Sequence, residues 1–173
     1  VDEAERRGLP VIGELELASR RARGRLVAVT GTNGKSTTVS LVHAMLQAAG
    51  AETVLVGNIG TAVSDHVESV GEKGFLVIEA SSFQLERVDH FAPEVAAVLN
   101  LAPDHLDRYD SFEEYAEAKH NILHAATADT SYVYPVGDEP MTSWAGTTPA
   151  RRCGFAWQRR GDAVSWEIGR AHV

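Results

Sequence analysis

Residues 26–37 read LVAVTGTNGKST, and this stretch decides the fold. Its first four residues are apolar, which is typical of a strand buried on both faces of a parallel sheet. A glycine-rich turn follows, and after it residues 35–49 carry apolar side chains at helical spacing and stop at Gly50. The stretch therefore predicts a strand–loop–helix unit, in which glycines let the N–H groups of the loop point inward at phosphate groups.

The loop of this unit has side chains suited to a nucleoside triphosphate. Lys35 can reach the β- and γ-phosphates, and Ser36 can place its hydroxyl on Mg²⁺. The helix N-terminus adds the positive end of its dipole. The strict phosphate-loop motif has a glycine where this chain has Val29, so a tight turn without a phosphate role is the alternative. The residues expected to contact ATP are Gly31, Thr32, Asn33, Gly34, Lys35, Ser36 and Thr37.

Strand and helix patterns alternate along the rest of the chain. This alternation predicts right-handed βαβ units and a doubly wound, mostly parallel α/β sheet. Ligands of such sheets bind beyond the carboxyl ends of the strands, so polar residues that follow strands are candidates for the site. Besides 26–29, strands are predicted at 53–56, 75–78, 95–99, 132–134, 151–155 and 163–168, and helices at 15–23, 35–49, 112–126 and 138–144.

Glu79 and Asn58 are two candidates that follow predicted strands. Glu79 comes directly after the strand 75–78, where nucleoside triphosphatases keep the acid that holds Mg²⁺. A helix cap or an ordinary loop carboxylate is the alternative for Glu79. Asn58 lies in the turn after the strand 53–56, where its carboxamide can meet a substrate or a metal, and a plain turn is the alternative.

His105 and Lys119 belong to the next loop and helix. A neutral imidazole can ligate a metal, with Asp104 as its orienting partner, and a surface histidine is the alternative. Lys119 lies within the apolar stripe of the helix 112–126, and a buried lysine is costly unless it is paired or modified. Either its stem runs to the domain edge and the ammonium stays in water, or the amine faces the site. A neutral amine there can take up CO₂ and become a carbamate, an anionic ligand for Mg²⁺.

Composition excludes several classes of protein. There are 16 Lys and Arg residues against 24 Asp and Glu, which argues against sequence-independent binding of nucleic acid. We find no apolar run long enough to span a bilayer and no secretory signal. The single cysteine, Cys153, cannot form an internal disulfide. We therefore expect a cytoplasmic protein with neither nucleic acid nor membrane as a partner. We also expect a monomer, although no feature of the composition indicates the oligomeric state.

Four segments together resemble the Mur ligase family, the ATP-dependent amide-forming enzymes of peptidoglycan assembly. They are the phosphate loop, GNIG at 57–60, EASSFQLE at 79–86 and DHLDRY at 104–109. The resemblance runs from about residue 11 to residue 134, and the loop matches the modified P-loop of the family. Within the family, these segments are most similar to the members that add D-glutamate.

The resemblance implies roles for single residues. Lys35 would contact the transferred phosphoryl group, and Ser36 and Glu79 would hold one Mg²⁺. His105 and a carbamylated Lys119 would hold or support a second Mg²⁺. The implied catalytic residues are thus Lys35, His105 and Lys119, whereas Asn58 and Ser81 would contact the substrate.

The implied reaction adds D-glutamate to UDP-N-acetylmuramoyl-L-alanine through an acyl phosphate formed with ATP. By the same resemblance, residues 1–25 are a linker and a helix leading in from a preceding domain, and residues 26–173 are a truncated central ATP-binding domain. The C-terminal domain that binds the amino acid lies outside the chain, so we expect the isolated fragment to be inactive. Two alternatives stay open: another Mur-type or folylpolyglutamate-type ligase, and a nucleotide-binding module without ligase activity.

Overall fold

The computed structural model describes residues 2–160 and 163–170, and its centre is a seven-stranded sheet. The strand order is β2-β3-β1-β4-β5-β6-β7. Strands β1 to β6 pair in parallel, and only β7 runs antiparallel to its neighbour β6. This topology confirms the doubly wound, mostly parallel α/β sheet. The strands are β1 (Arg25–Thr30), β2 (Thr53–Gly57), β3 (Phe75–Glu79), β4 (Val95–Val98), β5 (Ser131–Pro135), β6 (Arg151–Arg160) and β7 (Ala163–Arg170).

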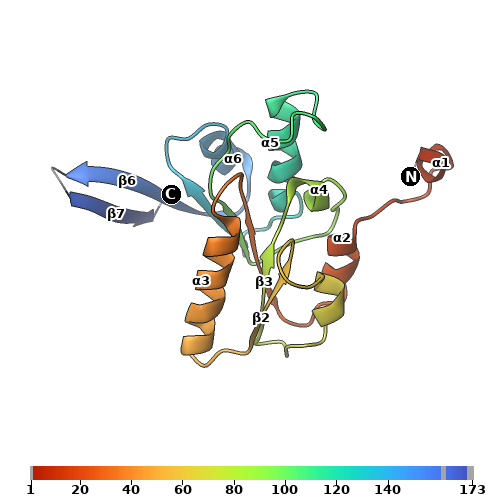
Figure 1. Ribbon diagram of the computed structural model, residues 1–173, viewed down its shortest axis with the longest axis horizontal. Coiled ribbons are helices and arrows are strands. Elements are labelled where there is room, and N and C mark those ends of the chain that lie inside the picture. The colour runs from red at the N-terminus through yellow and green to blue at the C-terminus, as the bar shows by residue number, and fades with distance from the viewer. Residues whose placement is uncertain (1, 161–162, 171–173) are drawn as a thin grey trace.

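Helices cover both faces of the sheet, as Figure 1 shows, with α3 on one face and α2, α4 and α5 on the other. None of the helices in the described part of the chain is long and apolar enough to cross a bilayer. The helices are α1 (Asp2–Arg6), α2 (Glu14–Ser19), α3 (Lys35–Ala48), α4 (Ser82–Leu85), α5 (Phe112–His120) and α6 (Met141–Thr147), with 3₁₀ turns η1 (Val63–His66) and η2 (Asn121–Leu123).

Two hydrophobic clusters fill the two faces of the sheet. On the α3 face, Val39 packs with Val29 and Val77. On the other face, a larger cluster combines alternate strand residues with Leu15 of α2 and Leu85 of α4. This alternation follows from the pleat, which sends successive side chains of a strand to opposite faces. The sheet is therefore buried on both sides, as its apolar strand sequences predict.

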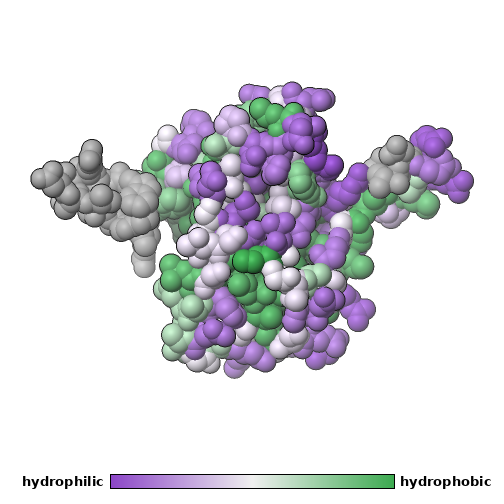
Figure 2. Space-filling model, viewed as in Figure 1, coloured by the Kyte–Doolittle hydropathy of each residue, from purple (hydrophilic) through white to green (hydrophobic). Residues whose placement is uncertain are grey.

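The surface is unequally polar. Figure 2 shows mainly hydrophilic residues at the end of the molecule around α5 and more hydrophobic ones over α3. Leu41 and Met45 on α3 are exposed. Helix α3 thus uses one face for the core and leaves apolar side chains on its outer face.

The prediction of a helix at 112–126 was wrong about the C-terminal end of that helix. The α-helix stops at His120, and a 3₁₀ turn carries Ile122 and Leu123 into the core. The carboxamide of Asn121 donates to the carbonyl oxygen of Leu85 at 3.2 Å. This hydrogen bond lies where the α-helix changes to the tighter 3₁₀ turn. An apolar stripe of one or two turns does not distinguish 3.6 residues per turn from three, so the pattern could not reveal this change.

Short helices were also missed. Helices α1 and α4 and the turn η1 have five residues or fewer, which is too short to show a period. Helix α6 begins at Met141, three residues after the predicted start, because Pro140 takes the N-cap position. The helix predicted at 15–23 already ends at Ser19, and the strand predicted at 151–155 extends to Arg160. The other predicted strands and helices lie within two residues of their observed bounds.

A buried carboxylate attaches α2 to the rest of the domain. Glu16 is fully buried, and it accepts hydrogen bonds from the N–H groups of Asp89, His90 and Phe91 at 2.9–3.1 Å. It also accepts from Nε of Arg20 at 2.6 Å. Burial alone would raise the pKa of Glu16, but these backbone and Arg20 interactions outweigh it and lower the pKa below its ordinary value.

We expect Glu16→Gln to lower the free energy of unfolding by about 3 kcal/mol at pH 7, because the amide cannot satisfy the three N–H donors and Arg20 together. The folded pKa lies below the unfolded value of 4.5, so the carboxylate stabilises the fold above that pH and loses this effect as pH falls through the folded pKa. Urea unfolding at a series of pH values measures the difference in the free energy of unfolding between the wild type and Glu16→Gln. A gap between wild type and variant that stays constant as the pH is lowered would contradict the assignment.

Candidate functional site

Loops from four strands meet at the carboxyl edge of the sheet. The parallel register pairs Glu79 with Val29 of β1 on one side and with Gly57 of β2 on the other. The predicted residues Glu79 and Asn58 therefore lie beside the start of the phosphate loop. The N–H of Asn58 donates to the carbonyl oxygen of Glu79 at 2.8 Å. Gly57 permits this approach, because its φ is +107° and an added Cβ would collide with that carbonyl.

The Glu79 carboxylate is buried and only half satisfied. Its side chain is 2% exposed, and Oε1 accepts from Nδ2 of Asn58 at 2.8 Å. Oε2 has no hydrogen-bond partner, and among the described residues it shares this state only with Thr30 Oγ1. The N-cap of α4 is Ser81, so the helix-cap alternative for Glu79 does not apply. A buried anionic oxygen without a partner is costly, and a cation would satisfy it.

The donor set fits a metal that arrives with a phosphate group. Within residues 2–160 and 163–170, no three His, Cys, Asp or Glu side chains come together as an all-protein metal site. Mg²⁺ typically takes one or two protein carboxylates and completes its shell with phosphate oxygens and water. Glu79 Oε2 is such a carboxylate oxygen, and the hydroxyl of the exposed Ser36, in the first turn of α3, is a further oxygen donor.

The phosphate loop is curled at the start of a 14-residue helix. Gly34 is the N-cap of α3 with a φ of +82°, a left-handed conformation that favours glycine. Lys35 Nζ donates to the carbonyl oxygens of Gly31 and Thr32 at 2.9 and 3.0 Å. The ammonium group is thus held within its own loop, and the positive end of the α3 dipole adds to the positive potential of this loop.

Asn100, the second residue after β4, is hydrogen-bonded to the phosphate loop, and the sequence analysis did not identify it as a site residue. Its Oδ1 accepts from the N–H of Asn33 at 2.8 Å, and its Nδ2 donates to the carbonyl oxygen of Asn33 at 2.9 Å. Its own carbonyl oxygen accepts from the N–H of Thr32 at 3.0 Å. A polar residue at the end of a predicted strand was the signal that could have found it, as it found Glu79.

Lys119 reaches the same loop from α5. Its side chain is 2% exposed, and Nζ donates to the carbonyl oxygen of Gly31 at 3.1 Å. The alternative with the ammonium in water at the domain edge does not fit this burial. Burial first, and then the positive charge of Lys35, lowers the pKa of Lys119 to about 8, against an opposing effect of Asp104. At a given pH near 8, more of this amine is therefore neutral than of an exposed lysine, whose pKa is about 10.4.

Tyr115 connects Lys119 to the remaining parts of the site. Lys119 Nζ lies 4.7 Å from the centroid of the Tyr115 ring, and the Tyr115 hydroxyl is 3.1 Å from Thr32 Oγ1. The ring of His105 is centred 6.3 Å from the same tyrosine. The structure thus brings His105, Lys119 and the phosphate loop together around one aromatic side chain. The metal-binding roles of His105 and Lys119 stay predictions.

His105 itself is exposed and has an unusual backbone. Its φ is +53°, which is uncommon for a residue other than glycine. Its Nε2 lies 3.7 Å from Oδ2 of Asp104, which is too long for a hydrogen bond but close enough for electrostatic influence. Asp104 is therefore near the imidazole, as the sequence predicts, without fixing its orientation in this structure.

Ser81 forms a reciprocal capping box with Gln84. Its Oγ accepts from the N–H of Gln84 at 3.3 Å, and its own N–H donates to Gln84 Oε1 at 3.0 Å. Capping of α4 is a sufficient structural reason for a serine here. Contact of Ser81 and Asn58 with a substrate stays a prediction.

Comparison with known proteins points to one family. Residues 29–165 match the family described as the Mur ligase middle domain. A protein of Koribacter versatilis named UDP-N-acetylmuramoylalanine--D-glutamate ligase is 40% identical over 158 residues, which is 91% of this chain and 35% of that protein. One of the same name from Alkaliphilus oremlandii is 51% identical over 124 residues, or 71% of this chain and 27% of that protein.

A solved structure shows the same fold. It is a MurF ligase from Thermotoga maritima in complex with ADP, with a TM-score of 0.67 and 20% identity over 84% of this chain and 38% of that one. The chain spans about a third of the length of the curated relatives that it matches.

We expect one of the three lysine side chains to titrate near pH 8. The chain has only Lys35, Lys73 and Lys119, so carbon-13 labelling of lysine Cε gives three resolvable signals. Lys119→Met should remove the signal that titrates near pH 8. Lys35→Met should raise the pKa of Lys119, because a like charge no longer opposes protonation. Lys73→Met, at an exposed position, is the matched control and should leave it unchanged.

The lowered pKa of Lys119 also makes the stability of the fold depend on pH. The folded pKa of Lys119 lies below the unfolded value of 10.5, so charging the amine destabilises the fold below about pH 8. This destabilisation is relieved as pH rises from about 8 to 10.5. A folded chain in which all three lysines titrate near 10.5 would show that the amine is not desolvated.

Proposed function

This chain belongs to the Mur ligase family, and on that premise we propose that it forms the ATP- and Mg²⁺-binding part of a ligase that adds D-glutamate to UDP-N-acetylmuramoyl-L-alanine. The observation that carries the proposal is the unpartnered, buried Oε2 of Glu79 at the edge of the sheet where the loop Gly31–Thr37 begins. A carboxylate oxygen left in this state fits a bound cation, and the adjoining loop fits the phosphates that would accompany it.

The substrate assignment is supported by the relatives. Those named UDP-N-acetylmuramoylalanine--D-glutamate ligase are between 34% and 51% identical to this chain. We assign residues 1–25 to a linker and a leading helix and residues from 26 onward to the central domain. The leading helix α2 contributes Leu15 and Ala18 to the hydrophobic core, so it is packed on the domain that it precedes. Binding of the amino acid is assigned to a further domain of the family.

The loop Gly31–Thr37 would hold the ATP phosphates. Lys35 would exchange its two carbonyl acceptors for oxygens of the transferred phosphoryl group, which are stronger acceptors because they are charged. Ser36 and Glu79 would hold the first Mg²⁺. When bound, that ion neutralises phosphate charge as a Lewis acid.

Lys119 and His105 would hold or support a second Mg²⁺. The neutral amine of Lys119 attacks CO₂, a nitrogen–carbon bond forms, and one amine proton is released to water, which leaves an anionic carbamate. The lowered pKa of Lys119 supports this step, because only the unprotonated amine carries the attacking electron pair. A carbamate oxygen is a hard anionic ligand of the type that Mg²⁺ prefers.

In the proposed reaction, an oxygen of the alanyl carboxylate attacks the γ-phosphorus in line, and ADP leaves. The amine of D-glutamate then attacks the acyl carbon, phosphate departs, and the new amide nitrogen loses a proton. This chain contributes position and positive charge, which account for most catalysis of phosphoryl transfer. Because the reaction consumes ATP and a nucleotide-linked precursor, we assign it to the cytoplasm.

Nucleotide binding is the first test. We expect the chain to bind Mg²⁺ with a non-hydrolysable ATP analogue in isothermal titration calorimetry, and Lys35→Ala to weaken that binding by roughly 10- to 100-fold through the lost charge-assisted bonds. Lys73→Ala should bind as the wild type does. In the intact enzyme, Lys35→Ala should abolish substrate-dependent ADP formation without loss of the fold. Retained ADP formation in that variant would falsify the proposal.

Carbamylation gives a separate test. With carbon-13 bicarbonate, Mg²⁺ and the ATP analogue, we expect a carbamate carbonyl signal in NMR spectra that Lys119→Met removes and Lys73→Met retains. If no lysine-dependent signal forms at any pH between 7 and 9, the second metal must be held in another way.

Phosphate release separates the rival functions. In the intact protein, release that depends on D-glutamate favours the proposal, whereas dependence on another amino acid or on a folate favours a sister ligase. Nucleotide binding without release with any of these acceptors indicates a binding module.

A further inference from the structure

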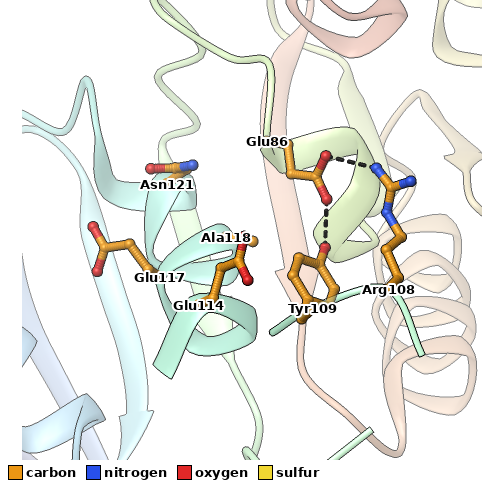
Figure 3. A pocket seen from close by; sticks show the side chains of 7 residues that line it. All are labelled: Glu86, Arg108, Tyr109, Glu114, Glu117, Ala118 and Asn121. Carbon is orange, nitrogen blue, oxygen red and sulfur yellow. Dashed lines mark hydrogen bonds and ion pairs between the residues drawn. The ribbon is translucent and has the colours of Figure 1, made fainter. Parts of the chain in front are cut away.

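The end of α4 is joined to the loop before α5 by one carboxylate. Figure 3 shows Glu86 turned toward Arg108 and Tyr109, with both interactions drawn as dashed lines. Glu86 Oε1 accepts from the Tyr109 hydroxyl at 2.6 Å, and Oε2 accepts from Nη2 of Arg108 at 2.8 Å. A cavity of about 480 Å³ lies beside this junction, lined by Glu86, Arg108, Tyr109, Glu114, Glu117, Ala118 and Asn121.

The two residues held by Glu86 pack on the ring that contacts His105. The Arg108 guanidinium lies 4.6 Å from the centroid of Phe83, and the Tyr109 ring stacks on Phe83 at 5.9 Å. Phe83 in turn lies 5.1 Å from the His105 ring. Glu86 is therefore linked to the imidazole through two neighbours and a shared aromatic ring, without touching the imidazole itself.

The backbone of His105 needs such a restraint. Its left-handed φ of +53° is an unfavourable conformation for a residue with a Cβ, and it persists only where surrounding contacts impose it. The carbonyl oxygen of His105 accepts from the N–H groups of Arg108 and Tyr109 at 2.9 and 3.1 Å. Residues 104–108 are exposed, so the buried Tyr109 and its bond to Glu86 form the anchor of this turn.

We propose that Glu86 is a positioning residue for His105: its carboxylate fixes Arg108 and Tyr109, and these hold the imidazole in the orientation needed to bind a metal. The proposal rests on the proposed function, in which His105 holds or supports the second Mg²⁺. It also accounts for Glu86, Arg108 and Tyr109 as parts of the segments 79–86 and 104–109, which the reaction itself leaves without a role.

The test uses Mn²⁺ as a paramagnetic substitute for Mg²⁺, together with a non-hydrolysable ATP analogue. Carbon-13 labelling of histidine gives ring signals, and His105→Gln identifies the one from His105. We expect Mn²⁺ to broaden that signal in the wild type, and Glu86→Gln to need roughly tenfold more Mn²⁺ for the same broadening. Loss of a residue that orients a metal ligand usually lowers metal affinity by about this factor.

Glu117→Gln is the matched control. Glu117 lines the same cavity and carries the same charge, but among the contacts of the described residues its side chain is paired with His120 on its own helix and not with the loop. It should therefore behave as the wild type does, which separates loss of the junction from loss of one negative charge. Tyr109→Phe removes one of the two hydrogen bonds of Glu86, so the Mn²⁺ concentration that it needs should lie between those of the wild type and Glu86→Gln. If Glu86→Gln fails to fold by circular dichroism, Tyr109→Phe provides the decision.

The outcomes separate the two proposals. The His105 signal could broaden at the same Mn²⁺ concentration in the wild type, Glu86→Gln and Tyr109→Phe. In that case the role of Glu86 is wrong and the proposed function stands. If His105 does not respond to Mn²⁺ in the wild type, both its metal role and the inference fail.

Discussion

Two ammonium groups share one carbonyl oxygen at the centre of this site. Lys35 Nζ lies 2.9 Å and Lys119 Nζ 3.1 Å from the oxygen of Gly31. A neutral acceptor cannot balance two positive charges, and burial together with the charge of Lys35 lowers the pKa of Lys119. The same imbalance makes the loop receptive to an anion. The two amines meet because β1 lies between β3 and β4 in parallel register and because α5 runs toward the loop that follows β1.

Opposite charge lies close to that meeting point. Glu79 presents an unpartnered oxygen at the end of β3, next to the strand that leads into the loop. The positive groups for phosphate lie on the helices α3 and α5, and the negative group for a cation lies at the end of β3, so all of them are supplied by elements of one packed domain. Rigid strands position charges with little reorganisation, which is the arrangement that electrostatic catalysis requires. The loop after β4 is more exposed, and side-chain hydrogen bonds attach it at both ends, through Asn100 and through Tyr109.

Much of the architecture could be predicted from local patterns. Apolar runs located the buried strands, because a strand covered on both faces must be apolar throughout. Helical spacing placed Lys119 on the buried side of α5, since a period of 3.6 residues is a property of the chain alone. The end of α5 could not be predicted, because a carbonyl group of Leu85 decides where Asn121 turns the helix. The short α4 escaped for a different reason, since four residues carry no period.

The sequence by itself determined the strand–loop–helix unit at residues 26–37, the acid at the end of β3 and the buried lysine, because glycine freedom, apolar runs and helical period act over a few residues. Only the tertiary structure decided that Asn100 braces Asn33, 67 residues away, and that Glu86 joins Arg108, 22 residues away. Such pairs depend on which strands become neighbours. That choice is set by the packing of the whole sheet, and no local pattern in the chain expresses it.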